Sequence, residues 1–226
     1  MHNLIEVSED SDGSFILRLD KSSNIHSLHV PGQATTDSYW DDFALLPPLI
    51  PAGPVGIIGL GAGTVVGLYR TFWPRRRLVA WEIDPVVVEV GRAYFGLADE
   101  ASLTIHIGDV FADSSPADGP FAGLLVDIFA DGAFHPRLQS ATIWRAWQRR
   151  LLPGGRIMVN LSGKHNDCLA VYESLRGVFG SALSSKRTAE AWNLLFLTGP
   201  PPDPVEWVAA LPASLGPRTD GWQPVV

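Results

Sequence analysis

Short apolar runs alternate with amphipathic segments through most of the chain, from residue 55 to residue 198. The runs Val55–Ile58 and Leu78–Glu82 are too short to be buried helices and are mostly apolar, which predicts buried strands. Strands that alternate with helices in this way predict an open, mostly parallel α/β sheet with helices on both faces. Further strands are expected at residues 103–107, 123–128, 156–161 and 194–198, and helices at 85–95, 138–151 and 167–179.

Two smaller parts flank this core. Residues 15–19 and 25–30 are typical of short strands around a polar turn, and a proline-rich stretch at 47–51 leads into the first buried strand. We therefore expect an N-terminal β-hairpin extension over residues 1–50, a Rossmann-like domain over 51–199, and a C-terminal tail over 200–226. The tail is rich in proline and tryptophan and is expected to lie across the surface.

Three alternating glycines, Gly59, Gly61 and Gly63, follow the first buried strand, and Glu82 ends the second. A glycine turn lets a ligand approach bare backbone, and an acid at the next strand end accepts hydrogen bonds from a ribose. A dinucleotide site has the pattern G-x-G-x-x-G. Counted from Gly59 or from Gly61, the third glycine would fall at position 64 or 66, and this chain has threonine and valine there. The pattern therefore favours an adenosyl compound without a pyrophosphate, such as S-adenosylmethionine.

Polar residues and a further glycine lie at the ends of the later strands. Gly108 and Asp109 follow the third strand, and Asp127 lies near the end of the fourth. Ligands of open parallel sheets bind outside the carboxyl ends of the strands. We expect Glu82, with Ile83 beside it, to hold the ribose. Asp109 is expected to accept from the adenine amino group where Gly108 leaves room, and Asp127 to face the reacting centre.

The composition limits the kinds of partner that the chain is expected to bind. The net charge of −7 and a sequence pI of about 5.3 argue against a nucleic-acid partner bound through a broad basic surface. The most apolar stretch is broken by glycines, so no membrane span is expected, and no cluster has metal-ligand spacing. Cys168 is the single cysteine, and no signal peptide is evident. A cytoplasmic location is expected, or a plastid one if a transit peptide is missing from this chain.

Several of these segments together resemble the spermidine synthase-like branch of the S-adenosylmethionine-dependent methyltransferase superfamily. The matching segments are residues 58–64, 81–85, 94–97, 108–109, 125–132 and 151–160. The last two, with 186–187 and 193–199, are similar to uncharacterised plant members. The resemblance implies a class I methyltransferase fold with a mostly parallel seven-stranded sheet, an S-adenosylmethionine or decarboxylated S-adenosylmethionine donor, and a homodimer formed through the N-terminal hairpins.

The chain departs from true aminopropyltransferases at the parts that bind the amine. Those enzymes have an Asp in the glycine turn where Ala62 stands here, and a Tyr-His-Glu segment where this chain continues from Tyr39 with Trp and Asp. Their Asp-Ser-Ser-Asp-Pro loop corresponds to the segment from Asp127 to Asp131, which is one residue longer between the acids and lacks the proline. Asp131, with Asp37 and the acids at 41 and 42, remains a candidate for holding a polyamine.

Three functional hypotheses remain. Methyl transfer to an unidentified small-molecule or protein acceptor is favoured over aminopropyl transfer. Its sulfonium donor is already activated, so the protein mainly has to align the nucleophile, the methyl group and the sulfur. Asp127 would take a proton from the acceptor, and Tyr39 or Asn160 would orient it. The alternatives are a polyamine aminopropyltransferase that uses decarboxylated S-adenosylmethionine, and a non-catalytic protein that kept the fold to bind a ligand or partner.

Overall fold

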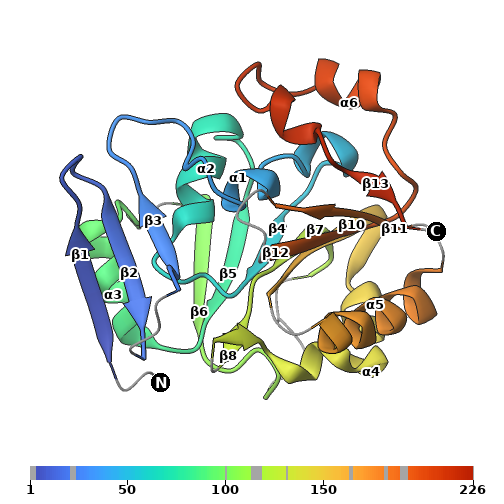
Figure 1. The fold of residues 1–226 in the computed structure, drawn as a ribbon, viewed down its shortest axis with the longest axis horizontal. Coiled ribbons are helices and arrows are strands. Elements are labelled where there is room, and N and C mark those ends of the chain that lie inside the picture. Colours follow the sequence, from blue (N-terminus) through green and yellow to red (C-terminus); the bar gives the residue numbers. More distant parts are fainter. Residues whose placement is uncertain are drawn as a thin grey trace.

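The computed structural model describes residues 4–20, 24–99, 101–112, 119–130, 132–162, 165–180, 183–188 and 193–225. Its centre is a sheet with the strand order β13-β11-β12-β10-β7-β4-β5-β6, shown in Figure 1. These strands are β4 (Val55–Ile58), β5 (Leu78–Glu82), β6 (Leu103–Ile107), β7 (Phe121–Val126), β10 (Leu151–Ser162), β11 (Leu183–Arg187), β12 (Asn193–Thr198) and β13 (Gln223–Pro224).

The sheet is mixed but mostly parallel. Strands β6, β5, β4, β7 and β10 run parallel, whereas β12 lies antiparallel between β10 and β11, and β13 lies antiparallel to β11. Every residue of β4, β5 and β7 is buried, as expected for strands that are covered on both faces. The predicted α/β fold is confirmed, and within the described residues the two-residue strand β13 extends the expected seven strands to eight.

The N-terminal unit is a three-stranded antiparallel sheet, and the expected hairpin forms two of its strands. Its strands are β1 (Ile5–Glu9), β2 (Phe15–Leu19) and β3 (Ser27–His29), in the order β1-β2-β3. The sheet packs through Leu17 and Leu19 against Val87 and Phe95. In Figure 1 it lies beside α3 at the side of the molecule that carries β5 and β6.

Helices cover both faces of the main sheet. One core cluster joins α1, α2, α3 and α6 to one face, and a second joins α4 and α5 to the other. The helices are α1 (Trp40–Phe43), α2 (Thr64–Phe72), α3 (Pro85–Tyr94), α4 (Ala141–Gln148), α5 (His165–Phe179) and α6 (Pro204–Ala209), and the 3-10 turns are η1 (Pro47–Leu49), η2 (Pro136–Gln139) and η3 (Gly216–Thr219). No helix in the described ranges is long and apolar enough to cross a membrane.

The helix expected over residues 138–151 is wrong in its bounds. Ser140 has extended backbone and separates η2 from α4, which ends at Gln148. Strand β10 begins at Leu151, five residues earlier than expected, and its register with β7 shifts between Leu151 and Arg156. A small hairpin of β8 (Phe129–Ala130) and β9 (Ala133–Phe134) follows β7.

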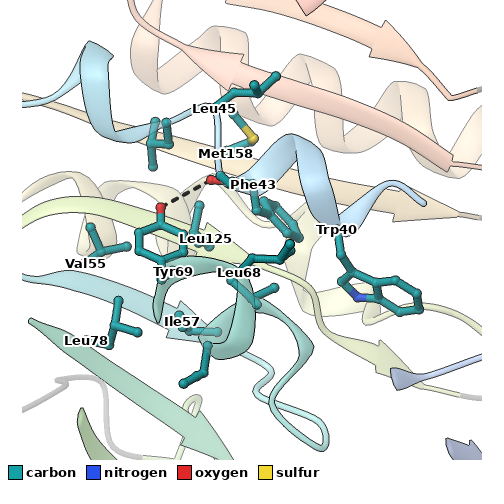
Figure 2. Packing of buried hydrophobic residues seen from close by; sticks show 14 of the residues in the cluster. Trp40, Phe43, Leu45, Val55, Ile57, Leu68, Tyr69, Leu78, Leu125 and Met158 are labelled. Carbon is teal, nitrogen blue, oxygen red and sulfur yellow. Dashed lines mark hydrogen bonds between the residues drawn. The ribbon is translucent and has the colours of Figure 1, made fainter. Parts of the chain in front are cut away.

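The tail beyond residue 200 contributes to the core. Trp207 of α6 is buried, and its indole N–H donates to the Leu45 carbonyl at 3.0 Å. Figure 2 shows the hydrophobic core around Leu45. There the Tyr69 hydroxyl donates to the Phe43 carbonyl at 3.2 Å, which connects α2 to α1. The α1 turn is therefore held between the sheet, α2 and the tail.

Candidate active site

The glycine turn brings the end of β4 against the end of β7. Gly59 has φ +91°, and a Cβ there would lie 2.2 Å from the carbonyl oxygen of Asp127. Gly61 and Gly63 also have positive φ, and Gly63 is the N-cap residue of α2. Backbone packing alone therefore requires glycine at position 59, whether or not a ligand binds.

The predicted donor-binding residues lie at neighbouring strand ends. The Glu82 carboxylate accepts from the Gly61 amide at 2.9 Å and from the Asp84 amide at 3.1 Å. Next to it, Ile83 is 48% exposed and the space around Gly108 is open, since a Cβ there would meet nothing within 4 Å. The ends of β5 and β6 are therefore open to solvent here, with the exposed Ile83 side chain beside them.

Asp109 has a local partner of its own. Its side chain is exposed and accepts from the Phe111 amide at 2.8 Å, so it shapes the turn after β6. The Gly108 amide donates to the Glu82 carbonyl at 2.9 Å, which joins this turn to the end of β5. The contact between Asp109 and an adenine stays a prediction.

Strand β3 of the N-terminal sheet closes over the glycine turn. The Ser27 hydroxyl accepts from the Ala62 amide at 2.8 Å, and Thr64 exchanges two hydrogen bonds with the backbone of Leu28. The Ala62 side chain is fully buried in the apolar cluster that includes Leu17 and Val87. The position that carries an Asp in aminopropyltransferases is thus packed into the core.

Asp127 is the centre of a hydrogen-bonded chain that spans four segments. The Tyr39 hydroxyl, from the N-terminus of α1, donates to Asp127 Oδ2 at 3.0 Å. The Asn160 amide, from β10, donates to Asp127 Oδ1 at 2.8 Å, and Asn193, from β12, donates to Asn160 Oδ1 at 2.9 Å. The structure thus brings together the predicted Asp127, Tyr39 and Asn160, and adds Asn193, which the sequence analysis missed.

Burial makes this carboxyl group a stronger base than an exposed one. Desolvation raises the pKa of Asp127 to about 6, although the hydrogen bonds from Asn160 and Tyr39 act in the opposite direction. Burial and the nearby Asp127 charge also hold the pKa of Tyr39 well above its usual 10, so Tyr39 remains a donor. Near neutral pH the pair is a carboxylate that can accept a proton, next to a hydroxyl that keeps its own.

The other predicted acids that the structure describes do not take part in the hydrogen-bonded set around Asp127. Asp131 lies outside the described residues. Asp41 and Asp42 are fully buried and form ion pairs with Arg218 and Lys186, so the expectation that they could hold a polyamine is wrong. Among the described residues, no group of three or more His, Cys, Asp or Glu side chains could hold a metal ion.

Comparisons with known proteins show which transferases the chain is similar to. No family model matches it. It is 23% identical over 188 residues, 80% of its length, to a probable polyamine aminopropyl transferase of Bifidobacterium longum, and 27% identical over 149 residues, 63% of its length, to a polyamine aminopropyltransferase of Vibrio vulnificus. The chain is similar to the spermidine synthase-like branch of the S-adenosylmethionine-dependent methyltransferase superfamily. It spans only 41% and 48% of the length of these two relatives.

Solved structures of two kinds of transferase share the fold. A probable spermidine synthase from Corynebacterium glutamicum superposes with a TM-score of 0.73 at 16% identity, over 86% of this chain and 76% of that one. Human methyltransferase-like protein 13 in complex with SAH superposes with a TM-score of 0.66 at 22% identity, over 79% of this chain and 88% of that one. Both kinds of named transferase therefore use this scaffold, and the similarity to plant members stays a prediction.

Proposed function

We propose that this protein transfers an alkyl group from an adenosyl sulfonium donor to an amine, with Asp127 as the proton acceptor. The observation that carries the proposal is the partly buried Asp127 carboxylate, held by Tyr39 and Asn160 directly beside the glycine turn. A base placed there lies at the strand edge where open α/β sheets bind their ligands.

The chemistry needs a neutral amine and a positioned base. The amine lone pair attacks the carbon bound to sulfur, the C–S bond breaks with its electron pair going to sulfur, and a neutral thioether leaves. The extra proton on nitrogen passes to Asp127, whose raised pKa makes it a better acceptor than an ordinary carboxylate. Tyr39 and Asn160 hold the two carboxylate oxygens in place.

The donor side is assigned to the neighbouring strand ends. Glu82 would hold the ribose hydroxyls, and the open space between Ile83 and Gly108 would take the adenine, with Asp109 at its rim. The glycine turn would pass close to the rest of the donor. A partly buried anion at Asp127 also favours a cationic sulfonium nearby.

Aminopropyl transfer to a polyamine is the first candidate reaction. Both curated relatives named above are polyamine aminopropyltransferases, so the comparisons support this alternative better than methyl transfer. The Tyr39–Asp127 pair gives this reaction the base it needs. The donor in this case is decarboxylated S-adenosylmethionine.

Methyl transfer remains a second candidate because of two specific observations. Ala62 is buried among apolar side chains, so the glycine turn offers no carboxylate to the amino group of an aminopropyl arm. Asp41 and Asp42 are already paired with cations of this chain and are not free to bind a polyamine. A 53-residue segment is also 34% identical to the mouse eEF1A lysine and N-terminal methyltransferase, over 24% of this chain and 8% of that protein.

Donor binding followed by product analysis tests the proposal. Each donor form is titrated separately while thermal unfolding is followed; at about a hundred times its Kd a ligand should stabilise the protein by roughly 2.7 kcal/mol. The bound form is then incubated with putrescine, spermidine and simple primary amines. Methylthioadenosine as product supports aminopropyl transfer, and S-adenosylhomocysteine supports methyl transfer. Binding without either product would indicate a non-catalytic protein, and binding of neither donor would contradict the proposal.

A further inference from the structure

The turn that carries Tyr39 depends on distant parts of the chain for its position. α1 has only four residues, too few for its own hydrogen bonds to fix it, and Tyr39 immediately precedes it. The next two positions after Trp40 are Asp41 and Asp42, whose side chains are fully buried. A buried carboxylate must be paired and hydrogen-bonded to stay charged, so the partners of these acids decide where the turn lies.

Asp41 joins the turn to the C-terminal tail. Its Oδ1 accepts from the backbone amide and the hydroxyl of Thr36, at 2.9 and 2.8 Å. Its Oδ2 accepts from the guanidinium of Arg218, in η3, at 2.6 Å. One carboxylate therefore fixes both the chain that enters the turn and the tail that lies over it.

Asp42 makes a second connection to the same region. Its Oδ1 accepts from the Lys186 ammonium of β11 at 2.7 Å and from the Trp222 indole at 3.4 Å. Its Oδ2 lies 3.8 Å from Arg218 and has no hydrogen-bond partner within the described part of the chain. Lys186 also donates to the Arg218 carbonyl at 2.7 Å, which closes the set of two acids and two cations.

This charge set ties the acceptor side of the site to the tail. Figure 1 shows the red C-terminal segment beside α1, on the same face of the sheet. If one cation is lost, a buried carboxylate is left without compensation, and the turn must move or the acid must take up a proton. Movement of a one-turn helix would displace the tyrosine at its N-terminus.

We propose that Arg218 is a positioning residue that holds the α1 turn so that the Tyr39 hydroxyl reaches Asp127. The inference relies on the proposed function only for the importance of that contact. It makes the tail part of the active-site apparatus, although Arg218 lies 177 residues from the acid that it binds.

A tyrosine NMR titration measures the contact without any donor or acceptor. The chain has four tyrosines, so a protein labelled with ¹³C at the phenol carbon gives few signals, and Tyr39→Phe assigns the one of interest. The groups that face Asp127 are Tyr39 and Trp40 from the α1 turn and Asn160 from β10. The Tyr39 signal of the wild type should therefore follow the ionisation of Asp127, with a midpoint at about pH 6.

Arg218→Met is expected to weaken this response and to raise its midpoint by about 0.5 to 1 pH unit, because Asp127 loses a hydrogen bond to its charged form. Arg218→Lys keeps a cation beside Asp41 and should retain the wild-type midpoint. The matched control is Arg92→Met, which removes an exposed ion pair with Asp99 on α3 and its following loop. It should also leave the midpoint unchanged.

Equal midpoints in the wild type, Arg218→Met and Arg92→Met would overturn the inference, as would Arg218→Lys shifting as far as Arg218→Met. If far-UV circular dichroism shows that Arg218→Met does not fold, Lys186→Met takes its place, since it removes the other cation of the set. An unchanged midpoint in that variant would likewise overturn the inference. Failure of the transfer reaction would leave all these outcomes interpretable.

Discussion

The proposed donor side and the proposed acceptor side of the candidate site are built in different ways. The donor side consists of backbone turns at consecutive strand ends, β4, β5 and β6, with Glu82 joining two of them. The acceptor side consists of side chains from four separate segments that meet at Asp127. The first side depends on local spacing in the sequence, and the second depends on how distant elements pack.

This difference explains how one scaffold can serve more than one transferase. Turns held by glycine geometry leave little freedom, because a side chain at Gly59 would collide with the backbone of β7's end. The departures from aminopropyltransferases, at Ala62 and around Tyr39, lie on the parts that would hold the transferred arm and the acceptor.

Gly59→Ala should produce the largest effect. The added methyl would meet the Asp127 carbonyl at 2.2 Å, and φ +91° is strained for alanine. We expect a loss of more than about 4 kcal/mol in the free energy of unfolding, measured by urea denaturation. Gly67→Ala is the control: it is exposed in α2 with open space around it, and should stabilise by about 0.5–1 kcal/mol. Similar stability in both variants would contradict the packing argument.

Asp127→Asn should abolish most turnover and weaken donor binding far less, since only the attraction between the carboxylate and the sulfonium is lost from the donor. Removing a general base costs about 10²- to 10⁴-fold in kcat, and the amide can still bond to Tyr39 and Asn160. Product formation with the donor identified by titration gives kcat, and calorimetry gives the donor Kd. Asp99→Asn, at an exposed position, is the control. An equal fall in donor affinity would place Asp127 on the donor side instead.

The same variant should gain stability at alkaline pH. The pKa of Asp127 is raised from 3.8 to about 6, so between these values the unfolded chain releases a proton that the folded protein keeps. Stability from this group therefore falls as pH rises, and the penalty is complete above about pH 6. Urea unfolding should show Asp127→Asn to be more stable than wild type by about 2–3 kcal/mol at pH 8 and equally stable near pH 3.5. A constant difference at both pH values would refute this.

Glu82→Gln should weaken the donor side alone. The neutral amide keeps one acceptor but loses the charge that bonds to the Gly61 and Asp84 amides and would bind a ribose. We expect donor Kd to rise about 10- to 100-fold with the acceptor KM unchanged. Glu89→Gln, exposed on α3, should change neither value. A parallel rise in both constants would show that the two sides are not separable.

Asn193→Ala should have the smallest effect. It leaves the buried Asn160 Oδ1 without its donor, so the amide that binds Asp127 loses orientation. A fall in kcat of about 3- to 10-fold is expected, because only about 1 kcal/mol of alignment is lost. Steady-state kinetics at saturating donor measures it, and an unchanged kcat would remove Asn193 from the acceptor side.

The placement of the glycine turn and Glu82 at neighbouring strand ends could be predicted because the signals are local, and donor binding there stays a prediction. The spacing of Gly59, Gly61 and Gly63 after one strand and Glu82 at the next fixed both the fold class and the expected ligand edge. The prediction that Asp127 lies at the same edge of the sheet followed from the rule that ligands bind at the carboxyl ends of the strands. These residues need no information about which helix covers which face.

The acceptor side was harder to predict because burial and pairing there are long-range. In the sequence, Asp41 and Asp42 look like ordinary solvent-exposed acids. Only the fold brings Arg218 to Asp41 from 177 residues away and Lys186 to Asp42 from 144 residues away. Asn193 had no local motif to mark it, since its partner Asn160 lies three elements earlier in the chain. The break at Ser140 was missed because an apolar periodicity continues across it.

The short strand β13 also has a consequence for the solution behaviour of the protein. It pairs Pro224 with Ser184 and Gln223 with Ser185, so it covers part of β11 at one margin of the sheet. Proline has no amide hydrogen to offer, and a further strand added there would lack a ladder bond. This margin is thus protected against strand-by-strand growth between molecules. Deleting residues 221–226 would uncover β11, and light scattering should then show aggregation that rises with concentration.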